Sequence, residues 1–589
     1  MDSEKKAEKP TRFLKRLIII LFAIVIILAG GVRYFSKKIS PFLAQQLKNQ
    51  VIRSSDSLYS ISFSDFSVSL LTGTITIQSF HLIPDPAVYD HLVSEKSAPA
   101  NLFNLSVTEL RLRHAHLFLL LFLHVVKIKN LAFDSPVIGI VHRNIVRSDT
   151  TQSIHQALAN LISGPLKAVY INRVELNDIS LSYKNLSDTG SKGIHVQNAQ
   201  LILKNFSLDA AALKDTSLFF YAQDTWVHFS DINLPTSDSL YYFRVADASY
   251  STGHERGILK NISLEPRYDD TTFDGRLKYR QDKFNISIDT ILFSGLSPND
   301  LIKEDISMRK LSVLNSGIDI YVNRGLPANP RKNLFPQQLL LKSPVRFILD
   351  TFHVERSNLT YREFNPVSGL TGEIPFDHIN GSVYNISNDP RALRKNHHCK
   401  GKISALFLNK GEVTTQFDID LTNKNNIFSY SGSLGPMKAK ALNEILRPLA
   451  LVKINSGEIH QCRFRFTADT AQAEGTVRIL YNDLSVKVLS KDSTTGKLKG
   501  KGLISIMANL FVINRGNITD TSNPQTVQVI YRRSPNQPVI NYMWKSLFTG
   551  VQEIAGIQPQ QTRDVINEFR ENKLVQKIRD KQEAKKHSK

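Results

Sequence analysis

The stretch IKNLAFDSPVIGI, residues 128–140, carries the pattern that decides the fold. Apolar and polar side chains alternate on both sides of a polar interruption that begins at Asp134. A period of two is typical of β-strands with one apolar and one polar face. The stretch therefore predicts two apolar strands joined by a polar kink, with apolar positions at Ile128, Leu131, Phe133, Ile138 and Ile140.

Two further copies of this pattern occur in the same frame, INRVELNDISLSY at 171–183 and LDTFHVERSNLTY at 349–361. A shortened relative, INSGEI, occupies 454–459. The full copies begin 43 and then 178 residues apart, which is too irregular for a fixed-period solenoid. We therefore predict a mainly β protein with a long, twisted antiparallel sheet that grows strand by strand.

Alternation also dominates much of the remaining chain, over 61–82, 194–208, 240–248, 284–293, 311–322, 403–421 and 476–488. Helical periodicity is confined to 40–52, 151–163, 436–450 and 541–586. A sheet of this size must hide its apolar face. It can fold over as a closed sandwich or curl into an open groove, and alternation alone leaves both open.

An uncharged apolar run, LIIILFAIVIILAGGV, spans residues 17–32 between basic flanks. Its length fits a membrane helix that is extended slightly by neighbouring residues. The small residues at 29–31 also allow a cleaved signal peptide, and both alternatives export the rest of the chain. We expect a retained single-pass anchor with a cytoplasmic N-terminus, built on Leu17, Ile20, Phe22, Val25, Leu28 and Val32.

The charge balance favours a membrane surface over nucleic acid. The 589 residues contain 74 Lys and Arg against 53 Asp and Glu, a net charge of +21. Part of this excess lies at the two ends, in 1–38 and 561–589. A nucleic-acid-binding protein would gather basic and aromatic residues on one face.

Only two cysteines are present, so a disulfide scaffold is excluded. Isolated buried thiols are expected at Cys399 and Cys462, with a disulfide between them as the alternative.

Catalytic motifs are missing from the sequence. There is no HExxH, GxSxG, GxGxxG or phosphate-loop pattern. The Gly-Lys run at 496–502 is interpreted as a basic hairpin turn, and His397-His398-Cys399 as a solvated turn without a fourth metal ligand. We therefore expect no enzyme activity, no metal and no cofactor.

Two stretches resemble the AsmA-like family, which includes TamB and the bridge-like lipid-transfer relatives. VKIKNLAFDSPVIGIV at 126–141 is similar to an early strand pair of that family. LNEILRPLALVKINSGEIHQCRFRFTADTAQAEGTVRILYNDLSVKVL at 442–489 is similar to its C-terminal region. Residues 210–345 resemble the family only in their general alternation of apolar and polar residues.

The resemblance implies an inner-membrane-anchored, β-taco-like groove in the periplasm of a diderm bacterium. Such a groove would shield phospholipid acyl chains between the inner and outer membranes and support outer-membrane integrity. An outer-membrane or envelope protein is the partner that the resemblance implies. An assembly factor for outer-membrane or secreted β-proteins, or a passive envelope scaffold, are the alternatives. The groove-lining candidates are Ile128, Leu131, Phe133, Ile171, Val174, Leu176, Leu181, Phe352, Val354 and Leu359.

This interpretation of the sequence divides the chain into five parts. They are an anchor at 1–38, β segments at 39–210, 211–435 and 436–540, and an amphipathic, basic tail at 541–589. Within the tail, residues 541–557 are expected to cap the open end of the sheet, with membrane contact as the alternative. Residues 561–589 are expected to form a solvated or partner-binding helix, with membrane contact as the alternative.

Overall fold

The protein is described by a computed structural model that covers residues 55–143, 167–186, 194–491 and 525–556. These ranges have short gaps at 70, 96–97, 100, 117–118, 120–122, 216–217, 303–304 and 332, and parts of 41–53, 498–500 and 516–517 are described as well. The described residues divide into two units. Unit 1 comprises the residues up to 232 together with 246–257, and unit 2 comprises 233–245 and the residues from 258 onward.

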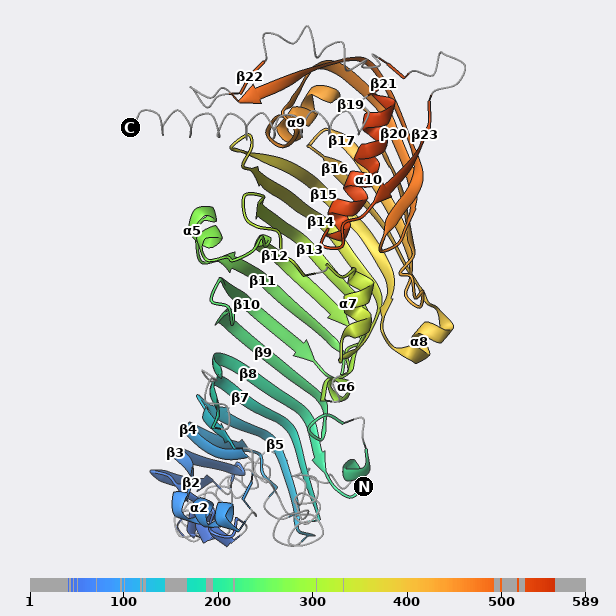
Figure 1. Ribbon diagram of the computed structural model, residues 1–589. Helices are drawn as coiled ribbons and strands as arrows, with labels where there is room; N and C mark the ends of the chain where they lie inside the picture. Colours follow the sequence, from blue (N-terminus) through green and yellow to red (C-terminus); the bar gives the residue numbers. More distant parts are fainter. Residues whose placement is uncertain are drawn as a thin grey trace, which may run out of the picture. The chain divides into compact units, whose positions relative to one another are not determined.

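The described residues are mainly β, as the alternation predicts, and their 23 strands belong to one large sheet (Figure 1). The first nine strands are β1 (Tyr59–Ser62), β2 (Asp65–Ser69), β3 (Thr74–Pro84), β4 (Asn101–Arg113), β5 (Val125–Asp134), β6 (Val137–His142), β7 (Ala168–Asn185), β8 (Ile194–Leu208) and β9 (Ala222–Pro235). The next seven are β10 (Tyr241–Ser251), β11 (Arg256–Pro266), β12 (Lys283–Ser294), β13 (Asp305–Asn323), β14 (Arg346–Asn365), β15 (Leu370–Ser387) and β16 (His398–Phe407). The last seven are β17 (Gly411–Asp420), β18 (Phe428–Leu434), β19 (Met437–Lys438), β20 (Val452–Ala468), β21 (Gln472–Lys491), β22 (Leu498–Gly500) and β23 (Val527–Arg532).

Helices are few and mostly short among the described residues. They are α2 (Pro86–Ser94), η1 (Ala212–Lys214), α5 (Asp270–Gly275), α6 (Pro298–Ile302), α7 (Pro336–Lys342), α8 (Pro390–Lys395), η2 (Ala439–Leu442), α9 (Asn443–Ala450) and α10 (Val539–Ile554). The predicted helices at 436–450 and 541–586 correspond to α9 and α10, but the described helix ends at Ile554. The predicted helix at 151–163 lies outside the described residues.

The prediction of a purely antiparallel sheet is wrong. Most neighbouring strands run antiparallel, but β5 and β6 both pair in parallel with β7, and β13 pairs in parallel with β14. Parallel neighbours need a crossover of a dozen or more residues between them. The segments 143–167 and 324–345 provide that length. Alternation has the same period in both arrangements, so it could not distinguish them.

The polar kink predicted in each copy is a residue with left-handed backbone geometry. Ser135, Asp178 and Arg356, each seven positions after the first apolar residue of its copy, have φ of 48°, 53° and 48°. An irregular residue of this type breaks strict alternation in the manner of a β-bulge. Apolar residues an odd number of positions apart, such as Leu176 and Leu181, can therefore point to the same face.

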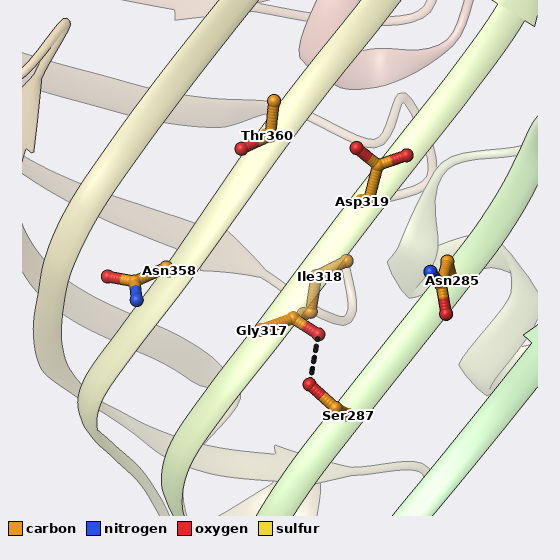
Figure 2. A pocket seen from close by; sticks show the side chains of 7 residues that line it. All are labelled: Asn285, Ser287, Gly317, Ile318, Asp319, Asn358 and Thr360. Carbon is orange, nitrogen blue, oxygen red and sulfur yellow. Dashed lines mark hydrogen bonds between the residues drawn. The ribbon is translucent and has the colours of Figure 1, made fainter.

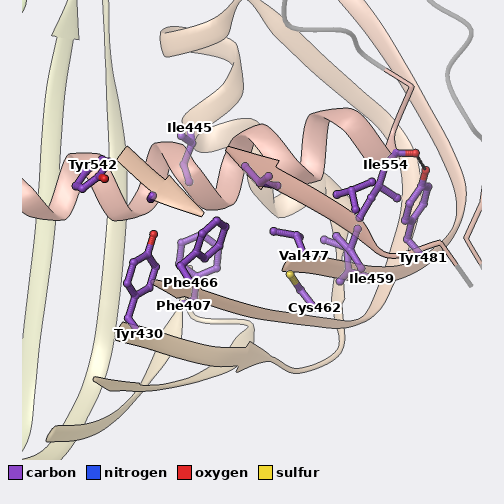
Figure 3. Close-up of a cluster of buried hydrophobic side chains, with 14 of the residues drawn as sticks. Phe407, Tyr430, Ile445, Ile459, Cys462, Phe466, Val477, Tyr481, Tyr542 and Ile554 are labelled. Carbon is purple, nitrogen blue, oxygen red and sulfur yellow. Dashed lines mark hydrogen bonds between the residues drawn. The ribbon is translucent and has the colours of Figure 1, made fainter. Parts of the chain in front are cut away.

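The largest apolar core of unit 2 forms where α10 packs against β21 and β23 (Figure 3). Tyr542 and Ile554, near the two ends of the helix, are both fully buried. The ring of Tyr542 stacks on Phe335, and Ile554 accepts a hydrogen bond of 3.4 Å from the Tyr481 hydroxyl through its carbonyl oxygen. We call this region, which also includes residues of β16, β18, β20 and α9, the C-terminal core.

The expectation that 541–557 caps an open edge of the sheet is therefore wrong. Helix α10 covers the apolar face of the strands, because its apolar side chains contact residues that point out of that face. Gly550 marks the closest approach, since a Cβ atom there would lie 2.5 Å from Cγ2 of Val477 and 2.8 Å from Cγ2 of Val529. Only glycine allows the helix to lie this near to the sheet.

Substituting the kink residue Asp178 tests the role of its left-handed geometry. Asp178→Val should lower the free energy of unfolding by about 1–2 kcal/mol, because a Cβ-branched side chain is strained at positive φ. Asp178→Gly, the matched control, should change it by less than about 0.5 kcal/mol, since glycine adopts this conformation freely. Urea unfolding followed by Trp226 fluorescence measures the difference; equal stabilities would contradict the assigned geometry.

The close approach of α10 predicts a second effect. Gly550→Ala should destabilise the C-terminal core by about 1–3 kcal/mol, because the added methyl group overpacks against Val477 and Val529. Gly275→Ala in α5 is the control, because a Cβ atom there meets nothing within 4 Å. This control should be neutral or stabilise by up to about 1 kcal/mol through helix propensity. Denaturation monitored by Trp544 fluorescence compares the two, and an unaffected Gly550→Ala protein would refute the packing.

Candidate functional site

The seven groove candidates of the first two copies lie side by side in unit 1. Strands β5 and β6 pair with β7 so that equivalent positions of the two copies are direct neighbours. The neighbouring pairs are Ile128 with Ile171, Leu131 with Val174, Phe133 with Leu176, and Ile138 with Leu181. Directly paired residues point to the same side of a sheet. We call this surface the N-terminal apolar face.

The N-terminal apolar face is packed at its centre and partly open around it. Ile128, Ile171 and Val174 are 6%, 7% and 6% exposed and form one cluster. Leu131, Phe133, Leu176 and other apolar residues from β4 and β8 pack against this cluster but remain half-buried. A closed sandwich would bury these side chains as completely as the cluster itself.

The remaining three candidates belong to a second apolar surface, in unit 2. Phe352, Val354 and Leu359 of β14 pair directly with Leu311, Val313 and Ile318 of β13. On the other side of β13, Ile286 is opposite Ile318, Ile291 opposite Val313 and Phe293 opposite Leu311. All of these apolar side chains are half-buried. We call the surface that they form on β12–β14 the central strip.

Strand β13 is a further copy of the repeated pattern that the sequence analysis missed. Met308, Leu311, Val313 and Ile318 occupy the same frame as the copy in β14, and each is paired with its equivalent there. Asn315 takes the kink position and has a φ of 52°. A search for the spacing of the apolar positions alone, with any residue type allowed at the kink, could have found this copy.

The kinks of neighbouring strands are joined by hydrogen bonds. The Arg356 side chain donates from Nε to Oδ1 of Asn315 at 2.8 Å, and Asn315 donates from Nδ2 to Asp289 at 3.0 Å. The backbone N–H of Arg356 donates to Oδ1 of Asn380 at 2.9 Å. These contacts cross β12–β15 in one row. They hold the irregular residues at the same level, which keeps the apolar positions in register.

The side of β12–β14 opposite the central strip is polar. Arg362 forms ion pairs with Asp319 at 2.8 Å and with Asp270 of α5 at 3.1 Å, and Lys283 also contacts Asp270 at 2.8 Å. Burial acts to raise the pKa of Asp270, but the hydrogen bonds from Lys283 and Arg362 outweigh it and lower the pKa. Phe273 of α5 is fully buried between the helix and the sheet. Together with the ion pairs of Asp270, it holds the helix on the sheet.

A hollow of about 250 Å³ lies on this same polar side (Figure 2). It is lined by Asn285, Ser287, Gly317, Ile318, Asp319, Asn358 and Thr360. The hollow exists because Gly317 has no side chain, and a Cβ atom there would lie 3.0 Å from Oγ of Ser287. Asp319 and Asn358 already bond to Arg362 and to the backbone N–H of His378. Two of its polar side chains are therefore already engaged within the protein, and its lining is polar and apolar in about equal parts.

The remaining motifs have structural roles. Residues 498–500 of the Gly-Lys run form β22, which pairs antiparallel with 489–491, so this part of the run is a strand of a hairpin and not its turn. His398 and Cys399 belong to β16, so their assignment to a turn is wrong; His398 contacts Asp418 at 2.7 Å. No cluster of three or more His, Cys, Asp or Glu suited to a metal ion occurs in the described ranges.

Both cysteines are free and buried, as expected from their isolation in the sequence. Burial, with a smaller contribution from Asp418, raises the pKa of Cys399 to about 11. Burial alone raises the pKa of Cys462 to about 12. Each thiol is therefore protonated near neutral pH and behaves as an apolar core group.

The predicted membrane anchor, residues 17–32, lies outside the described residues, as does the basic tail 561–589. Within the part of the chain that is described, no helix combines the length and the apolar character needed to cross a bilayer.

Comparisons with known proteins give no family assignment. No family model matches the chain, and no curated protein matches it. One solved structure, the crystal structure of a sex pheromone staph-cAM373 precursor, aligns with 58% of this chain and 86% of its own at 8% identity. Its TM-score of 0.12 is too low to support a shared fold.

Proposed function

We propose that this protein is an AsmA-like, membrane-anchored groove protein of the cell envelope that shields lipid acyl chains between the inner and outer membranes. Its role would be to support outer-membrane integrity without catalysis. The observation that carries the proposal is the in-register placement of apolar positions on one side of β12–β14, where they remain half-buried. A repeated apolar surface of this type offers contact to a hydrocarbon chain along its whole length.

The energetics support a surface of this size. Each buried CH₂ group contributes about 0.8 kcal/mol, so an acyl chain outside a membrane needs continuous apolar cover. Along β13, the central strip extends from Leu311 to Ile320, which is roughly 30 Å at about 3.3 Å per residue. A bilayer core is also about 30 Å thick and contains two layers of chains. The strip is therefore long enough for one extended acyl chain.

Within unit 2, the central strip is a better lipid surface than the C-terminal core. In the core, α10 already covers the apolar face, and residues such as Phe466 and Val477 are fully buried. On β12–β14, the corresponding side chains are only half-buried. A lipid on the strip would therefore bury new apolar surface without displacing protein.

Charge placed on the central strip should remove lipid binding. We expect wild-type protein, purified in mild detergent, to retain phospholipid that native mass spectrometry detects. Phe352→Asp should reduce the retained lipid at least fivefold, because a buried carboxylate is strongly unfavourable beside acyl chains. The matched control is Thr351→Asp, the adjacent residue, whose direct neighbour on β13 is Lys310.

The control should retain lipid at the wild-type level, and circular dichroism should show that both variants are folded. Lipid-free wild-type protein, or equal lipid retention by the two variants, would overturn the proposal. Capture of a polypeptide on β14 by a photo-crosslinking residue, in place of lipid, would instead support an assembly factor and contradict lipid shielding.

A further inference from the structure

At one end of the central strip, the apolar row gives way to charged side chains. Leu359, Tyr361 and Glu363 follow one another at every second position of β14 and so share one side of the sheet. Glu363 forms an ion pair of 2.8 Å with Arg324, which directly follows β13. The Tyr361 hydroxyl donates to the same carboxylate at 2.9 Å. The charged cluster is therefore continuous with the apolar surface.

A second arginine belongs to this cluster. Arg280 donates from Nη2 to the backbone oxygens of Arg324 and Leu326, at 2.9 and 3.1 Å. The Nε atoms of both Arg280 and Arg324 are buried and have no acceptor among the described residues. Buried donors are normally satisfied. The cluster thus holds more hydrogen-bond donors than its own acceptors can use.

Helix α10 adds a third cation, Lys545. Its side chain is exposed and makes no ion pair within the described part of the chain. Burial nevertheless lowers the pKa of Lys545, and the charges of Arg324 and Arg280 lower it further, against the opposing effect of Glu363. The charges of Arg324, Glu363 and Arg280 all act on Lys545, so the lysine of α10 lies within electrostatic range of the cluster.

The cluster has an unbalanced positive charge. Its three cations are opposed by two carboxyl groups, Glu363 and Asp282, and burial raises the pKa of Asp282, which weakens its contribution as an anion. Burial and the charge of Arg324 lower the pKa of Arg280. Burial acts to lower the pKa of Arg324, but the hydrogen bond to Glu363 outweighs it and raises the pKa. The positive charges of Arg280 and Lys545, whose pKa values are lowered, would be stabilised by an additional anion.

We propose that Arg280, Arg324 and Lys545 bind the phosphate of a lipid head group whose acyl chain lies on the central strip. The inference rests on the proposed function and adds the chemical class of the ligand, an anionic phospholipid. A phosphate offers several acceptor oxygens, which suit guanidinium donors and an ammonium group. The continuity of the cluster with Leu359 and Tyr361 favours a lipid phosphate over a free one.

Full-length protein in detergent micelles allows a direct test with three probes. The probes are phosphatidic acid, a diacylglycerol with the same chains and no phosphate, and inorganic phosphate alone. We expect phosphatidic acid to bind at least tenfold more tightly than either of the others. Lys545→Gln should weaken phosphatidic acid binding about tenfold, as for the loss of one charge-assisted hydrogen bond, and leave diacylglycerol binding unchanged.

Lys402→Gln is the matched control, because Lys402 is an exposed lysine of β16 without an ion pair in the described structure. It should bind all three probes as the wild type does. Equal binding of phosphatidic acid and diacylglycerol would overturn the head-group site while leaving lipid shielding intact. Inorganic phosphate binding as tightly as phosphatidic acid would also overturn it. If neither lipid binds, the proposed function fails as well.

Discussion

The fold depends on keeping apolar side chains on one face of strands that are interrupted. In a regular β-strand, successive side chains point to opposite faces. Strands β7 and β14 are longer than fifteen residues, and their apolar residues do not keep an even spacing throughout. One left-handed residue per copy, such as Asp178, resets the alternation. Since neighbouring strands carry this residue at the same level, their apolar positions stay paired across the sheet. The N-terminal apolar face and the central strip both follow from that pairing.

In unit 2, one apolar side of the sheet is used in two ways. Over β20, β21 and β23 it is covered by α10 and becomes an ordinary packed core. Over β12–β14 it is half-buried and ends in a charged cluster around Arg324. Lys545 of the covering helix is electrostatically coupled to that cluster, because the charges of Arg324, Glu363 and Arg280 act on its pKa. The helix thus marks where the packed part of the face ends.

Local pattern predicted the strands and the kinks, but not how distant segments pair. The alternation identified the copies in β5, β7 and β14, because each is a local signal. The parallel pairing could not be derived from it, since side chains alternate identically in both directions. The charged cluster left no sequence signal at all. Arg280, Arg324, Glu363 and Lys545 are far apart in the chain, and only the tertiary fold brings their charges together.

The two buried thiols make the interior of unit 2 open to chemical observation. Because Cys399 and Cys462 are enclosed and remain protonated near neutral pH, an alkylating reagent reaches them only after the surrounding strands separate. Cys462 lies in the C-terminal core, whereas Cys399 belongs to a separate cluster with Leu393 and Leu421. The labelling rates of the two cysteines would therefore report transient opening at two places in the same unit, without any engineered probe.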